Sequence, residues 1–150
     1  MAGRIDQAIA SRGLSRVGWE IMKRRILVVE DNPANGELLC DWLEAEGFDV
    51  VAAENLEQAF NALKTQAPDA VLLDVQLGAE DGLTLAAWIR KDPALLNTPI
   101  IGVTAHAMIT DHERVLQAGC NACISKPVDF KLLNQQLDRW LQLTATPKRI

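Results

Sequence analysis

The chain has no tyrosine, only three cysteines and no long apolar run, and each shortage limits what it can be. Three cysteines are too few, and odd in number, for a disulfide framework, so we expect a reducing, cytoplasmic location. No stretch approaches the ~18 consecutive apolar residues that a membrane span needs. The beginning of the sequence also lacks the continuous apolar segment of a secretory signal. We therefore expect no membrane association.

Clustered positive charge is also missing from most of the chain. Residues 1–25 carry six basic and two acidic side chains, whereas residues 26–150 carry nine basic and eighteen acidic ones. Because neutralising phosphates requires clustered lysine and arginine, so acidic a body is a poor nucleic-acid binder. The basic segment is too short and too mixed with apolar residues to act as a DNA-binding arm. We expect protein partners and no nucleic acid.

The sequence does contain a regular alternation of strand-like and helix-like segments. Hydrophobic residues make up 49% of the 150 residues, enough for the packed core of one domain. Short apolar runs bounded by polar residues predict strands near 26–29, 48–52, 70–74, 99–103 and 122–125. Helical spacing predicts helices near 33–46, 55–66, 82–91, 107–118 and 129–143. Strict alternation with short connections predicts a five-stranded parallel sheet covered on both faces.

The domain boundaries follow from where this alternation begins and ends. Residues 25–143 form the predicted α/β domain, and residues 144–150 form a C-terminal tail. Residues 1–24 lie outside the pattern as an N-terminal extension with some helical spacing. A plain surface extension and a docking or dimerisation element both remain open for it. Because little sequence follows the last predicted helix, we expect output through protein contacts, by a monomer or a weak dimer.

Chemically active side chains follow four of the five predicted strands. Glu30 and Asp31 follow the first, Asp74 ends the third, Thr104 follows the fourth and Lys126 follows the fifth. The carboxyl ends of parallel strands share one edge of the sheet, where open α/β folds bind their ligands. Two carboxylates ~4 Å apart repel by ~4 kcal/mol at an effective dielectric constant of 20. Either a pKa rises or a cation binds among the acids, and an all-oxygen site suits a hard ion such as magnesium, with manganese as an alternative.

The same strand ends resemble the receiver domains of bacterial two-component response regulators. The matching stretches are residues 26–32 (ILVVEDN), 71–75 (VLLDV) with 81–82 (DG), 103–105 (VTA) and 125–127 (SKP). They are most similar to single-domain cell-cycle regulators and to the receivers of hybrid histidine kinases. The resemblance implies a flavodoxin-like (βα)5 fold, a doubly wound sandwich with the parallel strand order 2-1-3-4-5.

The resemblance also implies a phosphorelay function for the acidic cluster. Asp74 would accept a phosphoryl group from a phosphohistidine, carried by a histidine kinase or a histidine phosphotransfer protein. Glu30, Asp31, Asp74 and the backbone carbonyl of Gln76 would hold one magnesium ion among waters. The chain would be a signalling domain and not a turnover enzyme, catalysing only its own phosphorylation and dephosphorylation.

Two further residues and one surface complete the implied mechanism. Lys126 would pair with a phosphoryl oxygen as a compact cation, and the Thr104 hydroxyl would donate to another. The bond between Lys126 and Pro127 would be cis by family analogy. A downstream protein effector would recognise the phosphorylated state at the face formed by residues 107–143.

The chain departs from the family pattern at several positions around the pocket. Cys123 stands where the family usually has an aromatic residue, so the usual aromatic switch is missing. Gly78 replaces a common proline, and we expect a more mobile loop there. Gln76 and His106, two residues after Asp74 and Thr104, occupy positions at which the family adjusts water access and dephosphorylation.

The remaining cysteine and histidine side chains have simpler interpretations. Cys120 and Cys123 form a C-x-x-C pair that bridges a predicted helix end and a strand, so packed thiols are favoured over a redox or zinc site. His112 is expected on a helix surface.

Two other functions remain open at this point. A phosphorylation-independent structural module with the same fold is favoured slightly by Cys123 and Gly78 and opposed by the complete set of acids, threonine and lysine. A phosphatase of the haloacid dehalogenase type also uses an aspartate nucleophile at a strand end. That class needs a second acid two residues later, and this chain has Gln76 there.

Overall fold

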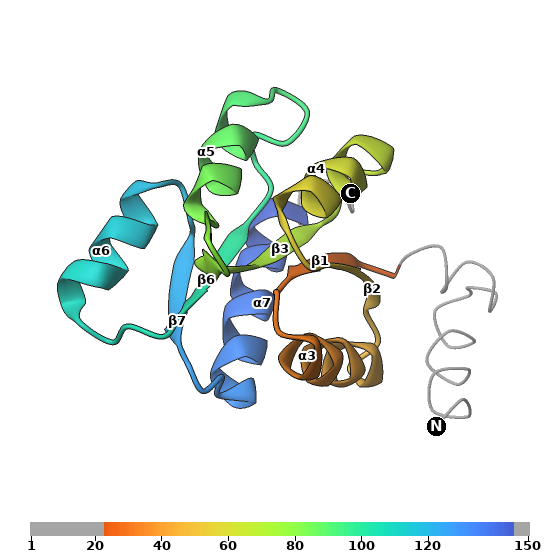
Figure 1. Cartoon of the computed structure of the whole chain (residues 1–150). Coiled ribbons are helices and arrows are strands. Elements are labelled where there is room, and N and C mark those ends of the chain that lie inside the picture. The colour runs from red at the N-terminus through yellow and green to blue at the C-terminus, as the bar shows by residue number, and fades with distance from the viewer. Residues whose placement is uncertain (1–22, 146–150) are drawn as a thin grey trace, which may run out of the picture.

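The computed structural model describes residues 23–145, and its centre is a five-stranded parallel sheet (Figure 1). The strands of this sheet are β1 (Arg25–Val29), β2 (Asp49–Ala53), β3 (Ala70–Asp74), β6 (Ile100–Thr104) and β7 (Ala122–Ser125). Their order is β2-β1-β3-β6-β7, and every neighbouring pair is parallel. This order confirms the predicted flavodoxin-like topology. The predicted extension and tail fall almost entirely on residues 1–22 and 146–150, outside the described residues.

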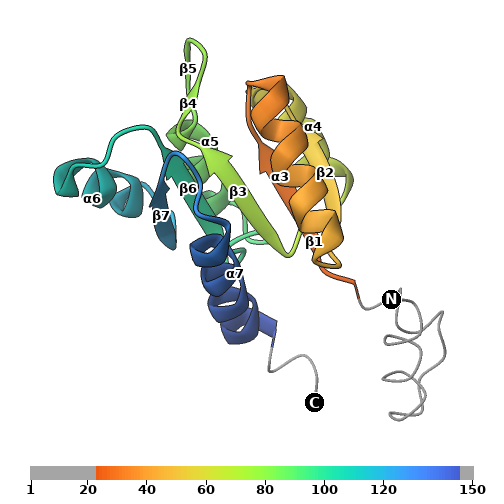
Figure 2. The same cartoon turned by 90° about the horizontal axis from the view of Figure 1, so that it is seen from below.

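Five helices cover the two faces of this sheet (Figures 1 and 2). They are α3 (Pro33–Ala45), α4 (Leu56–Thr65), α5 (Leu83–Lys91), α6 (Ile109–Gln117) and α7 (Phe130–Ala145). Buried side chains of α3 and α7 form one apolar cluster with alternate strand residues, and α4, α5 and α6 contribute to a second cluster. The all-buried pattern of β3 and β6 follows from this double cover. None of the helices in the described part of the chain is long and apolar enough to cross a membrane.

Helix α3 begins abruptly after β1, which keeps the first two acids at the sheet edge. The side chain of Asn32 accepts a hydrogen bond from the backbone N–H of Asn35 and caps the helix, and Pro33 follows at the first helical position. Only Glu30 and Asp31 separate the strand from this cap. A connection this short holds both carboxylates near the end of the strand.

The connection between β3 and α5 contains a small hairpin that the sequence did not predict. Strands β4 (Gln76–Leu77) and β5 (Glu80–Asp81) pair antiparallel, and Gly78 turns the chain with a φ of 60°. A positive φ at the first of two turn residues is the geometry that glycine supplies in a tight hairpin and that proline cannot adopt. The loop that we expected to be mobile therefore has a defined turn at Gly78.

Arg90 joins the amino edge of β6 to the end of α6. Its guanidinium donates to the carbonyl oxygens of Gly119, Leu96 and Thr98 and to the side-chain oxygen of Asn121, at distances of 2.7–3.1 Å. Burial lowers the pKa of Arg90, but four acceptors satisfy the guanidinium. This cluster holds the loops at the edge of the sheet opposite to the acids.

Candidate functional site

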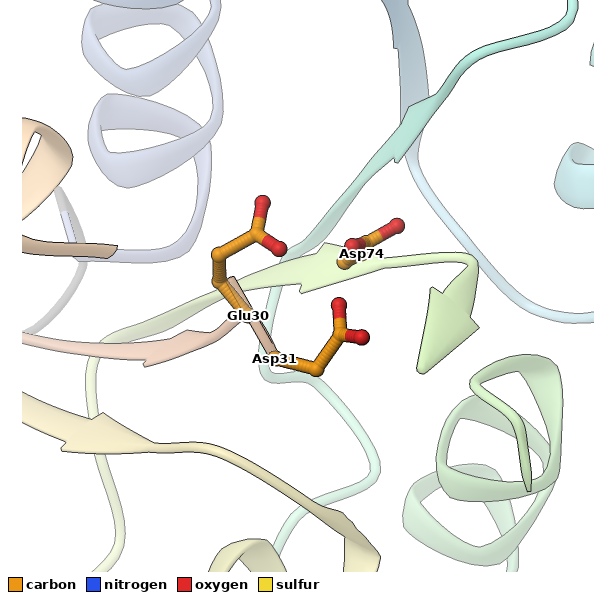
Figure 3. A group of neighbouring side chains, drawn as sticks. All are labelled: Glu30, Asp31 and Asp74. Carbon is orange, nitrogen blue, oxygen red and sulfur yellow. The ribbon is translucent and has the colours of Figure 1, made fainter. Parts of the chain in front are cut away.

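Three carboxylates converge at the carboxyl edge of the sheet. Glu30, Asp31 and Asp74 each offer an oxygen atom, and these atoms all lie within 4.8 Å of one another (Figure 3). Glu30 and Asp74 are each only 4% exposed, whereas Asp31 faces solvent. The predicted acidic pocket is therefore present, closed at its base and open on the side of Asp31.

The strand register explains why these acids meet. Strands β1 and β3 are parallel neighbours in which Val29 pairs with Leu73, so the next residue of each strand reaches the same level at the edge. Those next residues are Glu30 and Asp74. The backbone N–H of Glu30 donates to the Ala53 carbonyl at 3.0 Å, which continues the sheet ladder as far as the first acid.

Lys126 lies between two of the carboxylates. Its Nζ atom is 3.1 Å from Glu30 Oε1 and 3.0 Å from Asp74 Oδ2. Burial alone would lower the pKa of Lys126, but the hydrogen bonds to Asp74 and Glu30 outweigh it and hold that pKa above its ordinary value. The Lys126-Pro127 bond is cis, as the family resemblance implied.

One ammonium group does not balance the charge of three carboxylates, and the pKa of Glu30 is affected as a result. Burial raises the pKa of Glu30, and the neighbouring Asp74 carboxylate adds to the rise. A divalent cation would relieve the same repulsion without protonating a carboxylate. The donor set is entirely carboxylate oxygen and one side chain is open to water, so the residues present fit magnesium.

Two backbone segments frame Asp74. The backbone N–H of Gln76 donates to Asp74 Oδ1 at 3.0 Å, so the residue expected to offer its carbonyl to the metal lies beside the pocket. Gly82 packs against the strand end on the other side: its N–H donates to the Val75 carbonyl at 2.8 Å. A Cβ atom on Gly82 would collide with the backbone carbonyl oxygen of Asp74. The sequence marked Gly82 only as part of a motif, and the structure supplies the physical reason for it.

Thr104 ends β6 one strand away from Asp74. It is 1% exposed, and its Oγ1 accepts a hydrogen bond from the backbone N–H of His106 at 3.0 Å. The side chains of Gln76 and His106 meet at the exposed rim, with 3.1 Å between Gln76 Nε2 and His106 Nε2. The sequence singled out both residues as modulators, but it did not indicate that they contact each other.

The cysteines behave as packed thiols. Burial is the main cause that raises the pKa of Cys120 to about 12 and that of Cys123 to about 11. Neither thiol is ionised near neutral pH, which removes the nucleophile that redox chemistry requires. His112, in contrast, is not the surface residue that we expected. It is half-buried on α6, and its Nε2 lies 2.9 Å from Ser125 Oγ.

Comparison with known proteins decides the family. The response regulator receiver domain family matches residues 26–138 of this chain. The chain belongs to this family. The polar-differentiation response regulator DivK of Brucella anthropi is 39% identical to this receiver over 120 residues, which cover 80% of this chain and 98% of DivK.

Solved receiver structures agree with this one. The receiver domain of sensor histidine kinase PA1611 from Pseudomonas aeruginosa, with magnesium coordinated in its active-site cleft, is 35% identical with a TM-score of 0.73, over 79% of this chain and 98% of that one. The BeF3-activated receiver domain of Klebsiella pneumoniae RstA is 30% identical with a TM-score of 0.72, over 79% of this chain and 98% of that one.

These findings confirm the family resemblance and the function that follows from it at the level of the family. The chain is a signalling domain of a two-component system, and its relatives include both a stand-alone regulator and a histidine kinase receiver. The fold and the acidic pocket agree with this assignment.

Proposed function

We propose that Asp74 is the phosphoacceptor of this receiver. A carboxylate oxygen of Asp74 attacks the phosphorus atom of a phosphohistidine, the phosphorus–nitrogen bond breaks, and the bonding pair leaves with the histidine nitrogen. The observation that carries the proposal is the environment of Asp74. It is a buried carboxylate at the sheet edge, with one oxygen bonded to the Gln76 N–H and the other to Lys126.

The acidic cluster suits the metal that such a transfer uses. Glu30, Asp31, Asp74 and the backbone carbonyl of Gln76 would hold magnesium, and manganese has the same preference for oxygen ligands. When bound, the ion supplies positive charge to the acids and to the oxygens of the phosphoryl group. The magnesium in the cleft of the Pseudomonas receiver supports this assignment by analogy.

Lys126 and Thr104 would distinguish the two states of the site. Lys126 donates to Asp74 and Glu30 in the unmodified protein, and an aspartyl phosphate would offer it a phosphoryl oxygen in their place. The Thr104 hydroxyl, two strands from Glu30 at the same edge, would donate to a second phosphoryl oxygen. Contacts that exist only after transfer stabilise the active state selectively.

The rim residues Gln76 and His106 would control access to the aspartyl phosphate. Their side chains contact each other beside the pocket and are exposed to solvent. We assign the rate of self-dephosphorylation to this pair, because Gln76 lies directly beside Asp74 and its backbone N–H donates to that carboxylate. The catalysis of this receiver would be limited to its own phosphorylation and dephosphorylation.

The partners follow from the chemistry. A histidine kinase or a histidine phosphotransfer protein would supply the phosphoryl group in the cytoplasm, and a protein effector would bind at residues 107–143. Large apolar side chains are exposed there, with Met108 at 68% and Ile109 at 79%. A surface of this kind suits a protein partner better than nucleic acid.

Phosphorylation by a small donor tests the acceptor. The chain should take up phosphate from acetyl phosphate or phosphoramidate in the presence of magnesium, and Asp74→Asn should abolish the uptake. Asp41→Asn, at an exposed aspartate of α3, is the matched control and should leave uptake unchanged. Labelling that persists in Asp74→Asn would overturn the assignment. Complete absence of labelling and of a response to beryllofluoride in the unaltered chain would favour the phosphorylation-independent module.

A further inference from the structure

A side-chain contact links helix α6 to the strand that carries the pocket lysine. His112 Nε2 lies 2.9 Å from Ser125 Oγ. Ser125 is the last residue of β7, and Lys126 follows it directly. The contact therefore joins α6, a helix outside the pocket, to the backbone segment that positions Lys126.

The strand register places Ser125 next to the second switch residue as well. Thr104 pairs with Ser125 across β6 and β7, and paired residues of parallel strands lie on the same face of the sheet. The backbone N–H of Lys126 donates to the Thr104 carbonyl at 2.7 Å. A displacement of Lys126 therefore reaches Ser125 through the peptide link between them, and a displacement of Thr104 reaches it through the hydrogen bond to Lys126.

Where α6 packs on β6 and β7, the strand residues at the level of Gly102 are small. Cys123 pairs with Gly102, so the position where the family carries an aromatic residue holds a small thiol beside a glycine. A Cβ atom on Gly102 would lie 2.6 Å from Val115 Cγ1, which shows that α6 packs directly on the strand backbone. Val115 is fully buried there, and His112 is one turn away on the same helix.

We propose that His112 is a positioning residue that couples α6 to the phosphorylation pocket through Ser125. The inference rests on the proposed function of Asp74 and names the residues through which phosphorylation of that site would affect α6. When Lys126 and Thr104 exchange their present partners for phosphoryl oxygens, Ser125 moves with them. His112 transmits that movement to α6, and this link does the work that the side chain at position 123 is too small to do.

The size of the effect follows from a single hydrogen bond. A neutral hydrogen bond changes a two-state equilibrium roughly two- to tenfold in water. Loss of the His112–Ser125 contact should therefore weaken the preference of α6 for its pocket-dependent position by roughly that factor. The chemistry at Asp74 should continue, because neither His112 nor Ser125 contributes a side chain to the acidic cluster.

Backbone amide NMR of the full chain, with and without magnesium and beryllofluoride, tests the coupling. In the unaltered chain, addition should shift the amides of the pocket and those of α6. His112→Ala and Ser125→Ala should keep the pocket shifts and reduce the α6 shifts. His112→Gln should restore them, because a glutamine amide reaches about as far as Nε2 and can either donate or accept. Glu113→Gln, at an exposed neighbour on α6, is the matched control and should behave as the unaltered chain does.

The outcomes separate the two proposals. An unaltered chain whose pocket amides do not respond contradicts the proposed function itself. If both His112→Ala and Ser125→Ala keep the full α6 shifts along with the pocket shifts, the coupling is wrong and the proposed function stands. The coupling is also wrong if the α6 amides of the unaltered chain never respond. If His112→Ala fails to fold, Ser125→Ala and the rescue by His112→Gln still decide the question. The double variant should lose no more of the α6 response than either single variant, because both remove one contact.

Discussion

Replacing Lys126 by methionine should destabilise the metal-free protein and should make its stability strongly dependent on magnesium. Methionine keeps the length and the apolar stem of lysine but removes the charge. In the unaltered chain, Lys126 Nζ is 3.1 Å from Glu30 Oε1 and 3.0 Å from Asp74 Oδ2. Its removal leaves two buried carboxylates facing each other without a cation.

The magnitude follows from the burial of the partners. Breaking a buried ion pair by removing one member costs about 3–5 kcal/mol. The side chain of Lys126 is 26% exposed, whereas those of Glu30 and Asp74 are 3% and 4% exposed, so water screens the lysine more than the acids. We expect Lys126→Met to lower the free energy of unfolding by about 2–3 kcal/mol in metal-free buffer. Asp74→Asn should have the opposite sign and raise it by about 1 kcal/mol, because it removes one of the mutually repelling charges.

Urea unfolding in EDTA and in magnesium measures both effects. A ligand that binds only the folded state stabilises it by about 2.7 kcal/mol at 100 times its dissociation constant. Magnesium should therefore recover most of the loss in Lys126→Met and should stabilise Asp74→Asn much less. Lys131→Met, at an exposed lysine of α7, is the control and should change stability by no more than about 0.5 kcal/mol. A Lys126→Met protein as stable in EDTA as the unaltered chain would refute this account of the pocket.

Three further predictions concern the scaffold and the thiols. Arg90→Ala should lower the free energy of unfolding by about 2–4 kcal/mol in urea titrations, because it removes four hydrogen bonds at one edge of the sheet. Gly82→Ala should cost about 3 kcal/mol through its collision with backbone, whereas Gly36→Ala, whose Cβ would meet nothing closer than 3.8 Å, should gain about 0.5–1 kcal/mol. With pKa values of about 12 and about 11, Cys120 and Cys123 should alkylate slowly at pH 8. Their rates, followed site by site by mass spectrometry, should rise about tenfold per pH unit until the pH approaches the pKa, and rapid modification at pH 7 would contradict burial as the cause.

The strands and the pocket could be predicted because they follow from patterns that are visible in the sequence. Apolar runs of the right length indicate buried strands, and parallel strands bring their carboxyl ends to one edge. Glu30, Asp74, Thr104 and Lys126 all stand at such ends, so their meeting required only the strand order. Helix bounds differed from the predicted ones by one or two residues in most cases, which is the usual fraying at helix ends.

The features that the sequence did not reveal depend on tertiary packing. Strands β4 and β5 have two residues each, too few to show any periodicity, and only the positive φ of Gly78 explains their turn. The contacts between Gln76 and His106 and between His112 and Ser125 join residues 30 and 13 positions apart. Whether such side chains meet depends on helix placement, which no local pattern encodes.

The small residue at position 123 and the close approach of α6 are two aspects of one arrangement. A phosphorylation switch needs contacts that differ between two states, and no particular type of side chain is required for them. An aromatic side chain at position 123 would add volume on the face where Val115 already occupies the space above Gly102. Helix α6 would then have to move outward, and His112 would move away from Ser125. The absence of an aromatic residue at position 123 is therefore no argument against a switch, because a small side chain there is compatible with the close packing of α6 on β6 and with the contact between His112 and Ser125.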